Sequence, residues 1–173
     1  MLTPAPVAAV GEALLASFRH NLRAYKSLAD RALAQLSDAD WLDQPAPGSN
    51  SAAVTVQHLV GNLRSRFTDF LTTDGEKAAS QRDAEFEEPV SAVPALKKAW
   101  EVAWRILFDL HDALQPADLL RTVPIRGETH TVLAALQRQV VHYASHVGQL
   151  VQLAKIIRGN EFKSLSIPRG QSQ

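Results

Sequence analysis

Residues 140–149 read Val-Val-His-Tyr-Ala-Ser-His-Val-Gly-Gln and lie in what the surrounding apolar spacing predicts to be the last long helix. His142 and His146 are four residues apart, so on a helix their rings lie one turn apart on the same face. Gln139 and Gln149 continue this polar face beside apolar positions that point into a core. The stretch therefore predicts a helix at the edge of a core and two imidazoles that can converge on one cation.

His58 is the candidate for a third ligand. It lies in a second helical pattern, which one of Ser49, Asn50 or Ser51 can cap and which runs to about residue 72. On that helix Asn62, Ser65 and Asp69 follow His58 in a narrow arc, a polar stripe that matches the one on the last helix. Three histidines with one coordination position left open are a common form of catalytic metal site. The chain has no cysteine, so thiolate ligands and disulfides are excluded.

The residues by themselves leave a structural interpretation open. A histidine near an apolar face is more often hydrogen-bonded in the core or at the surface than bound to a metal, and the pair lacks the Glu of the H-E-x-x-H motif. His20 and His130 are expected to be solvated, and His111, beside Asp112, is not expected to be a ligand. No Ser-His-Asp order, glycine-rich phosphate loop or carboxylate pair stands out, so the catalytic residues are unknown.

Four amphipathic patterns predict an all-α, up-down four-helix bundle that occupies residues 1–173 as a single domain. They cover residues 7–36, about 50–72, about 91–115 and about 130–158. Residues 119–129 have extended character with a turn at Gly127, which predicts a short β-hairpin before the last helix. A charged stretch up to Pro89 is expected to form a long surface connection, and residues 162–168 to pack back on the bundle.

Charge and hydropathy narrow the class of partner. Lys and Arg number 18, as do Asp and Glu, so the formal net charge of zero provides no overall field to attract nucleic acid or an anionic membrane. No apolar run approaches the roughly 18 residues of a membrane span, and no basic leader precedes one. We expect a cytoplasmic protein whose partner is a small molecule.

The three histidines and the helices that carry them resemble the DinB superfamily of metal-binding four-helix bundles, which includes the YfiT-like proteins. In that superfamily one histidine on the second helix and an H-x-x-x-H pair on the fourth bind a divalent metal, which matches His58, His142 and His146 in order, spacing and helix. The stretches at residues 61–76, 142–149 and 165–170 further resemble a bacterial branch of unknown function. The resemblance covers nearly the whole chain.

The resemblance implies a divalent metal as cofactor, for which we expect nickel or zinc rather than iron. Imidazole suits several of these ions, so the sequence does not choose among them. Four polar residues are expected to hold the orientation of the histidine rings or to contact the bound ligand, namely Asn62, Asp69, Ser145 and Gln149. It also implies a homodimer. The tryptophans Trp100 and Trp104 agree with this, because one core need not hold both.

The function expected from these patterns is a metal-dependent enzyme acting on a small molecule, either a thiol S-transferase or a hydrolase. Relatives elsewhere in the superfamily imply a low-molecular-weight thiol as the second cofactor, and a protein without cysteine must take its thiol from solution. Arg64, Arg66 or Arg82 can pair with carboxylates of such a thiol. The alternative is a non-catalytic bundle that binds metal or a small ligand, for instance in a stress response.

Overall fold

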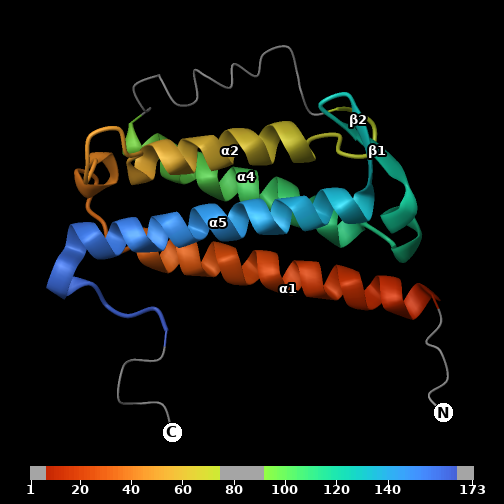
Figure 1. Cartoon of the computed structure of the whole chain (residues 1–173), viewed down its shortest axis with the longest axis horizontal. Helices are drawn as coiled ribbons and strands as arrows, with labels where there is room; N and C mark the ends of the chain where they lie inside the picture. Colours follow the sequence, from red (N-terminus) through yellow and green to blue (C-terminus); the bar gives the residue numbers. More distant parts are fainter. Residues whose placement is uncertain (1–6, 75–91, 167–173) are drawn as a thin grey trace, which may run out of the picture.

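The computed structural model describes residues 7–74 and 92–166. In these ranges four long helices form a bundle (Figure 1): α1 (Val7–Leu33), α2 (Ala52–Phe67), α4 (Val93–Ala113) and α5 (Val132–Arg158). Three short 3-10 helices, η1 (Asp40–Leu42), η2 (Pro116–Leu120) and η3 (Gly159–Glu161), lie at the bundle ends. The predicted all-α bundle is confirmed. Arg82 and residues 167–170 of the last motif lie outside the described residues.

Contacts between α1 and α4 show that these helices are antiparallel. Trp100 Nε1 donates to Asp30 Oδ1 over 2.8 Å, and Arg19 Nε lies 2.9 Å from Asp112 Oδ1. Later residues of α4 thus meet earlier residues of α1.

The other helix pairs give the remaining directions. After α5 the chain returns to the end of α1, where Gln35 Oε1 accepts from the Lys163 amide over 2.7 Å. α1 and α5 therefore run parallel. The His58 and His142 rings meet, and Tyr143 donates to Asn62, so α2 and α5 are in contact. Because α5 begins near the end of α2, the two helices run antiparallel. In chain order the helices run up, down, down and up, so α2 and α4 are parallel and the up-down alternation predicted from the sequence is not followed (Figure 1).

Local signals explain where the helices that carry the site begin and end. The Ser51 hydroxyl accepts from the Val54 amide and begins α2, and the Thr131 hydroxyl does the same for Ala134 at the start of α5. α5 ends at Gly159, whose φ of 51° suits a residue without a Cβ.

The core is rich in aromatic side chains and lies among all four helices. Trp41 in η1, Trp100 and Trp104 on α4, and Tyr143 on α5 are each at most 3% exposed. One core therefore holds both Trp100 and Trp104, and the argument for a dimer based on these two residues is wrong. Trp41 is buried in η1 at one end of the bundle.

The predicted hairpin is present at the other end of the bundle. β1 (Thr122–Ile125) pairs antiparallel with β2 (Glu128–Thr131), and Arg126 and Gly127 form the connection between them. Their φ values of 54° and 74° are both positive, as a type I′ turn requires. The Asp74 carboxylate accepts from both turn amides, over 2.7 and 2.9 Å. These two bonds lower the pKa of Asp74, the one from Gly127 most, and tie the hairpin to the segment after α2.

None of the helices in the described ranges combines the length and the apolar character needed to cross a bilayer.

His111 is buried in α4. It is 1% exposed, and neither of its ring nitrogens has a hydrogen-bond partner among the described residues. Burial lowers the pKa of His111, Arg19 and Arg23 on α1 lower it further, and the neighbouring Asp112 raises it. The imidazole is therefore neutral in the folded protein at neutral pH.

We predict that His111 makes the fold sensitive to acid. Its folded pKa lies below the unfolded value of about 6.5, so the stability it contributes is complete above that pH and is lost as the pH falls. His111→Leu should lose less unfolding free energy between pH 7 and pH 5.5 than the wild type, as measured by urea denaturation. The exposed His20→Asn is the matched control and should follow the wild type. Parallel pH slopes for all three proteins would contradict the prediction.

Candidate metal centre

The packing of α2 against α5 brings His58, His142 and His146 together. His58 Nε2 lies 3.2 Å from His142 Nε2, and the ring centroids of His58 and His146 are 4.9 Å apart. One ring nitrogen from each residue can be chosen so that all three lie within 4.8 Å of one another, which makes this a group that can hold a metal ion. The juxtaposition that the two polar stripes predicted is therefore present.

The donor set fits a divalent ion. Two nitrogens bound to one ion at about 2.0–2.1 Å lie roughly 2.8–3.4 Å apart, from the octahedral to the tetrahedral angle. The separation of 3.2 Å between the Nε2 atoms of His58 and His142 falls in that range. Neutral imidazole is also the donor that zinc, nickel and copper share, so the residues fit several ions and select no single one.

Gln149 orients the ring of His146, as the sequence predicts for a residue one turn further along α5. His146 Nδ1 lies 2.9 Å from Gln149 Oε1. An amide oxygen can only accept, so Nδ1 carries the proton and the lone pair is on Nε2. This arrangement, with one nitrogen fixed by a hydrogen bond and the other available, is typical of histidines that bind metals.

A buried tyrosine lies beside the three histidines. Tyr143 is fully buried, and its hydroxyl donates to Asn62 Oδ1 over 2.9 Å. Its ring packs against Trp104 on α4 with centroids 5.3 Å apart, and burial raises its pKa well above the usual value. Tyr143 therefore stays protonated and holds Asn62, one turn after His58, in a fixed place.

The three histidines open on a cavity of about 380 Å³, which we call the triad cavity. This volume suits a small molecule, since ligand pockets commonly span about 300–1,000 Å³. The triad cavity is lined by three histidines, three arginines and two amides: His58, His142, His146, Arg66, Arg126, Arg138, Asn62 and Gln139.

Charge and burial around the cavity keep His142 neutral. Burial, which is the largest cause, and the charges of His146, His58, Arg138 and Arg126 together lower its pKa to about 4. His142 is thus neutral at neutral pH, which is the form that binds a metal.

Three of the predicted contact residues lie away from the triad cavity. Ser145 and Arg64 are exposed on α5 and α2, and Asp69 is exposed after the end of α2. None of the three lines the cavity. The sequence-based argument could not exclude them, because an arc on a helical wheel is wider than the part of the helix that a cavity touches.

Two lining residues were missed by the sequence interpretation. Arg138 lies four residues before His142, so the same spacing that pairs the histidines would have placed it on their face. Arg126 gives no such signal, because it reaches the cavity from the hairpin turn, which is remote in sequence from both α2 and the triad pair.

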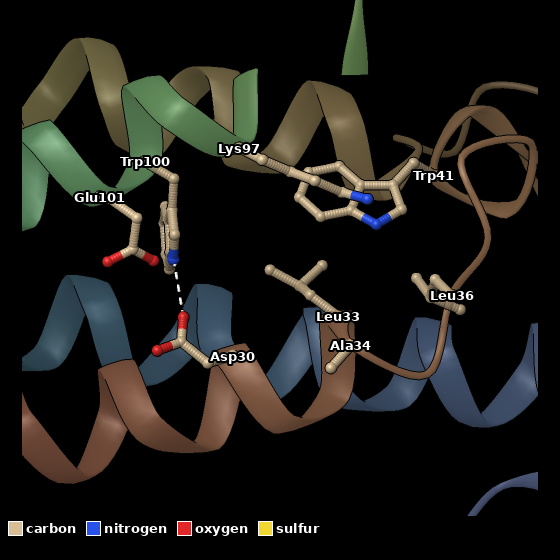
Figure 2. A pocket seen from close by; sticks show the side chains of 8 residues that line it. All are labelled: Asp30, Leu33, Ala34, Leu36, Trp41, Lys97, Trp100 and Glu101. Atoms are coloured by element: carbon tan, nitrogen blue, oxygen red, sulfur yellow. Dashed lines mark hydrogen bonds between the residues drawn. The ribbon is translucent and has the colours of Figure 1, made fainter. Parts of the chain in front are cut away.

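A second cavity of about 440 Å³ lies between α1 and α4. Figure 2 shows the apolar side chains of Leu33, Leu36 and Trp41 around it, with the bond from Trp100 to Asp30 at its side. Its lining includes no histidine. The wall of the triad cavity contains three histidines that can hold a metal ion, so this cavity is the better candidate for a functional site.

Fold and site together define a class: an all-α four-helix bundle in which one helix contributes one histidine and another contributes two to a group that can hold a metal ion. The chain belongs to the family described as "Protein of unknown function (DUF1572)", whose sequence profile matches residues 9–171. No curated protein and no solved structure matches the chain.

We predict that the tautomer of His146 depends on Gln149. In the metal-free wild type at pH 8, long-range nitrogen-15 NMR should show the proton of His146 on Nδ1, because Gln149 accepts it. Gln149→Met should shift His146 toward the Nε2 tautomer, which is the commoner form of an unconstrained imidazole in water. The control is Gln152→Met. Gln152 is exposed and lies three residues further along α5, so its replacement should leave the spectrum unchanged. An Nε2 tautomer already dominant in the wild type would refute the assignment.

Proposed function

We propose that this chain is a DinB-like protein in which His58, His142 and His146 bind one divalent metal, nickel or zinc. We further propose that the protein is a thiol S-transferase that acts on a small molecule and uses this metal as its cofactor. The observation that carries the proposal is the convergence of three histidines at the wall of an open cavity of about 380 Å³. A purely structural site is normally closed by a fourth protein ligand, whereas a catalytic one keeps a position for substrate.

The chemistry can be stated in terms of bonds. A thiol loses its proton to solvent, its sulfur forms a bond to an electrophilic carbon, and the bond from that carbon to its leaving group breaks. A bound divalent metal would lower the pKa of a thiol or a water molecule in its open position. The residues of the chain would hold the ligand: Gln149 keeps the lone pair of His146 on Nε2, and Asn62 offers an amide fixed by Tyr143.

The lining favours thiol transfer over hydrolysis. Hydrolysis of an ester or amide usually needs a proton acceptor besides the metal, and the described residues that line the triad cavity include no Asp or Glu. Transfer of a thiol, with a free pKa near 8–9, needs only that the thiolate be stabilised, which nearby guanidinium groups assist. A non-catalytic metal- or ligand-binding bundle is the alternative that the assays below distinguish.

We predict one metal site per chain. Wild-type protein purified without a nickel column should bind about one equivalent of nickel or zinc after dialysis, as measured by elemental analysis. The double variant His142→Ala, His146→Ala should weaken binding by more than about 100-fold, since it removes two of three donors. The matched double variant His20→Ala, His130→Ala removes two imidazoles that do not line the cavity and should bind like the wild type. Equal metal content in both double variants would exclude the site.

We predict that the metal-loaded protein accelerates the reaction of a thiol with monochlorobimane, in which sulfur replaces chloride. Glutathione, cysteine and bacillithiol are the thiols to test, with ester and amide substrates assayed in parallel. His58→Ala should abolish the acceleration, and His20→Ala should not. If the fully loaded wild type turns over neither class of substrate, the protein is better described as a binding module.

The homodimer remains a prediction that rests on the resemblance alone. Light scattering at micromolar concentration tests it.

A further inference from the structure

The second cavity, which we call the α1–α4 cavity, differs in character from the triad cavity. Its most buried lining residues are two leucines and two tryptophans, each at most 6% exposed: Leu33, Leu36, Trp41 and Trp100. Its volume of about 440 Å³ lies in the range of small-molecule pockets. Indole rings present a large, rigid apolar surface, against which another aromatic ring packs well. The shape and the lining therefore suit a small aromatic molecule.

The charged side chains at the edge of the α1–α4 cavity have partners of opposite sign. Lys26 Nζ lies 2.7 Å from Asp30 Oδ2 and 2.9 Å from Glu101 Oε1. Lys97 Nζ lies 2.7 Å from Asp38 Oδ1. A charged ligand would have to compete with these pairs, whereas a neutral one leaves them intact. The charge balance therefore favours a neutral ligand.

Trp41 supplies a directed polar group. The residue is 2% exposed, and its Nε1 has no hydrogen-bond partner among the described residues. Figure 2 shows the edge of the indole that carries Nε1 turned toward Leu33 and Leu36, whose side chains have no acceptor. Trp100, in the same lining, differs because its Nε1 already donates to Asp30 over 2.8 Å. An indole N–H can only donate, and a buried one normally has an acceptor, so Trp41 calls for an acceptor from a ligand.

Lys97 places a second donor in the same part of the α1–α4 cavity. Its Nζ lies 5.1 Å from the centroid of the Trp41 ring. An ammonium group has three N–H donors, and the bond to Asp38 uses one of them. A carbonyl oxygen has two lone pairs, so it suits a place that two donors border.

We propose that the α1–α4 cavity binds a small neutral molecule that carries a carbonyl oxygen on an aromatic ring. The ring packs against Trp41 and Trp100, and the oxygen accepts from Trp41 Nε1. Because Nε1 is buried, the oxygen reaches it after a small rearrangement of the neighbouring side chains, which is common when ligands bind. The α1–α4 cavity shares no lining residue with the triad cavity, so the proposal does not depend on a metal or on thiol transfer.

Two compounds of nearly the same shape test the role of the oxygen. Acetophenone has the proposed ring and carbonyl group, and in α-methylstyrene a CH₂ group replaces the oxygen. The chain has three tryptophans, so proton–nitrogen correlation spectra of the full chain show three indole signals, which Trp→Phe variants assign. Acetophenone should move the Trp41 indole proton downfield, because a new hydrogen bond deshields it. It should also bind about fivefold more tightly than α-methylstyrene, the effect of one hydrogen bond.

Trp104 provides the internal control for these spectra. Its Nε1 also has no partner among the described residues, but it does not line the α1–α4 cavity. Its indole signal should therefore stay in place during the acetophenone titration. Equal shifts of the Trp41 and Trp104 signals would show non-specific binding and overturn the proposal.

Variants locate the binding site. Trp41→Phe keeps an aromatic ring and removes the N–H, so it should abolish the preference for acetophenone over α-methylstyrene. Ala34→Leu tests the same site without changing the buried core, because Ala34 is exposed and lines the cavity. It should weaken binding of both compounds by more than fivefold. Ala24→Leu, at an exposed position of α1 outside the lining, is the matched control and should bind like the wild type.

A last variant separates this site from the triad cavity. The double variant His142→Ala, His146→Ala should bind acetophenone with the affinity of the wild type. Equal affinity of the wild type for the two compounds, acetophenone binding that survives Ala34→Leu, or acetophenone binding lost in the histidine double variant would each overturn the inference.

Discussion

The antiparallel contact between α2 and α5 is the constraint on which the rest of the site depends. His142 and His146 are one turn apart on α5, and the His58 ring reaches both of them from α2. Tyr143, the residue after His142, donates to Asn62, one turn after His58, and so fixes the register of the two helices with a hydrogen bond across the same interface. A shift of either helix by one residue would rotate its polar side chains by about 100° and separate the rings.

The core beneath this contact makes it rigid. Tyr143 packs between Phe67 on α2 and Trp104 on α4, with its ring fully buried. Close-packed aromatic rings leave little room for a helix to slide, because even small displacements open voids or cause overlaps. The apolar side of α5 thus positions the polar side, and a strongly polar site is supported by a large apolar core.

The hairpin and its anchor bring an arginine to the cavity that the three histidines line. The Asp74 carboxylate stabilises two backbone amides of the turn, and the turn then carries the Arg126 side chain to the triad cavity. Because α2 and α4 run parallel, the hairpin that follows α4 lies at the same end of the bundle as the end of α2 (Figure 1). Helix direction therefore decides which loop completes the site.

The sequence by itself determined whatever depends on distances within one element. The spacing of apolar residues predicted the four helices, the extended stretch around Gly127 predicted the hairpin, and the separation of His142 from His146 predicted two rings on one face. Arg138 was available to the same reasoning. These features follow from 3.6 residues per turn and from turn chemistry, which are local.

Only the tertiary structure decided which elements meet. It brought His58 to the pair, placed Arg126 at the triad cavity, left Asp69 and Ser145 outside it, and buried both Trp100 and Trp104 in one core. It also set the parallel direction of α2 and α4. The amphipathic pattern of a helix is the same whichever way its neighbour runs, so contacts between elements depend on packing of the whole core and cannot be read from any one stretch of sequence.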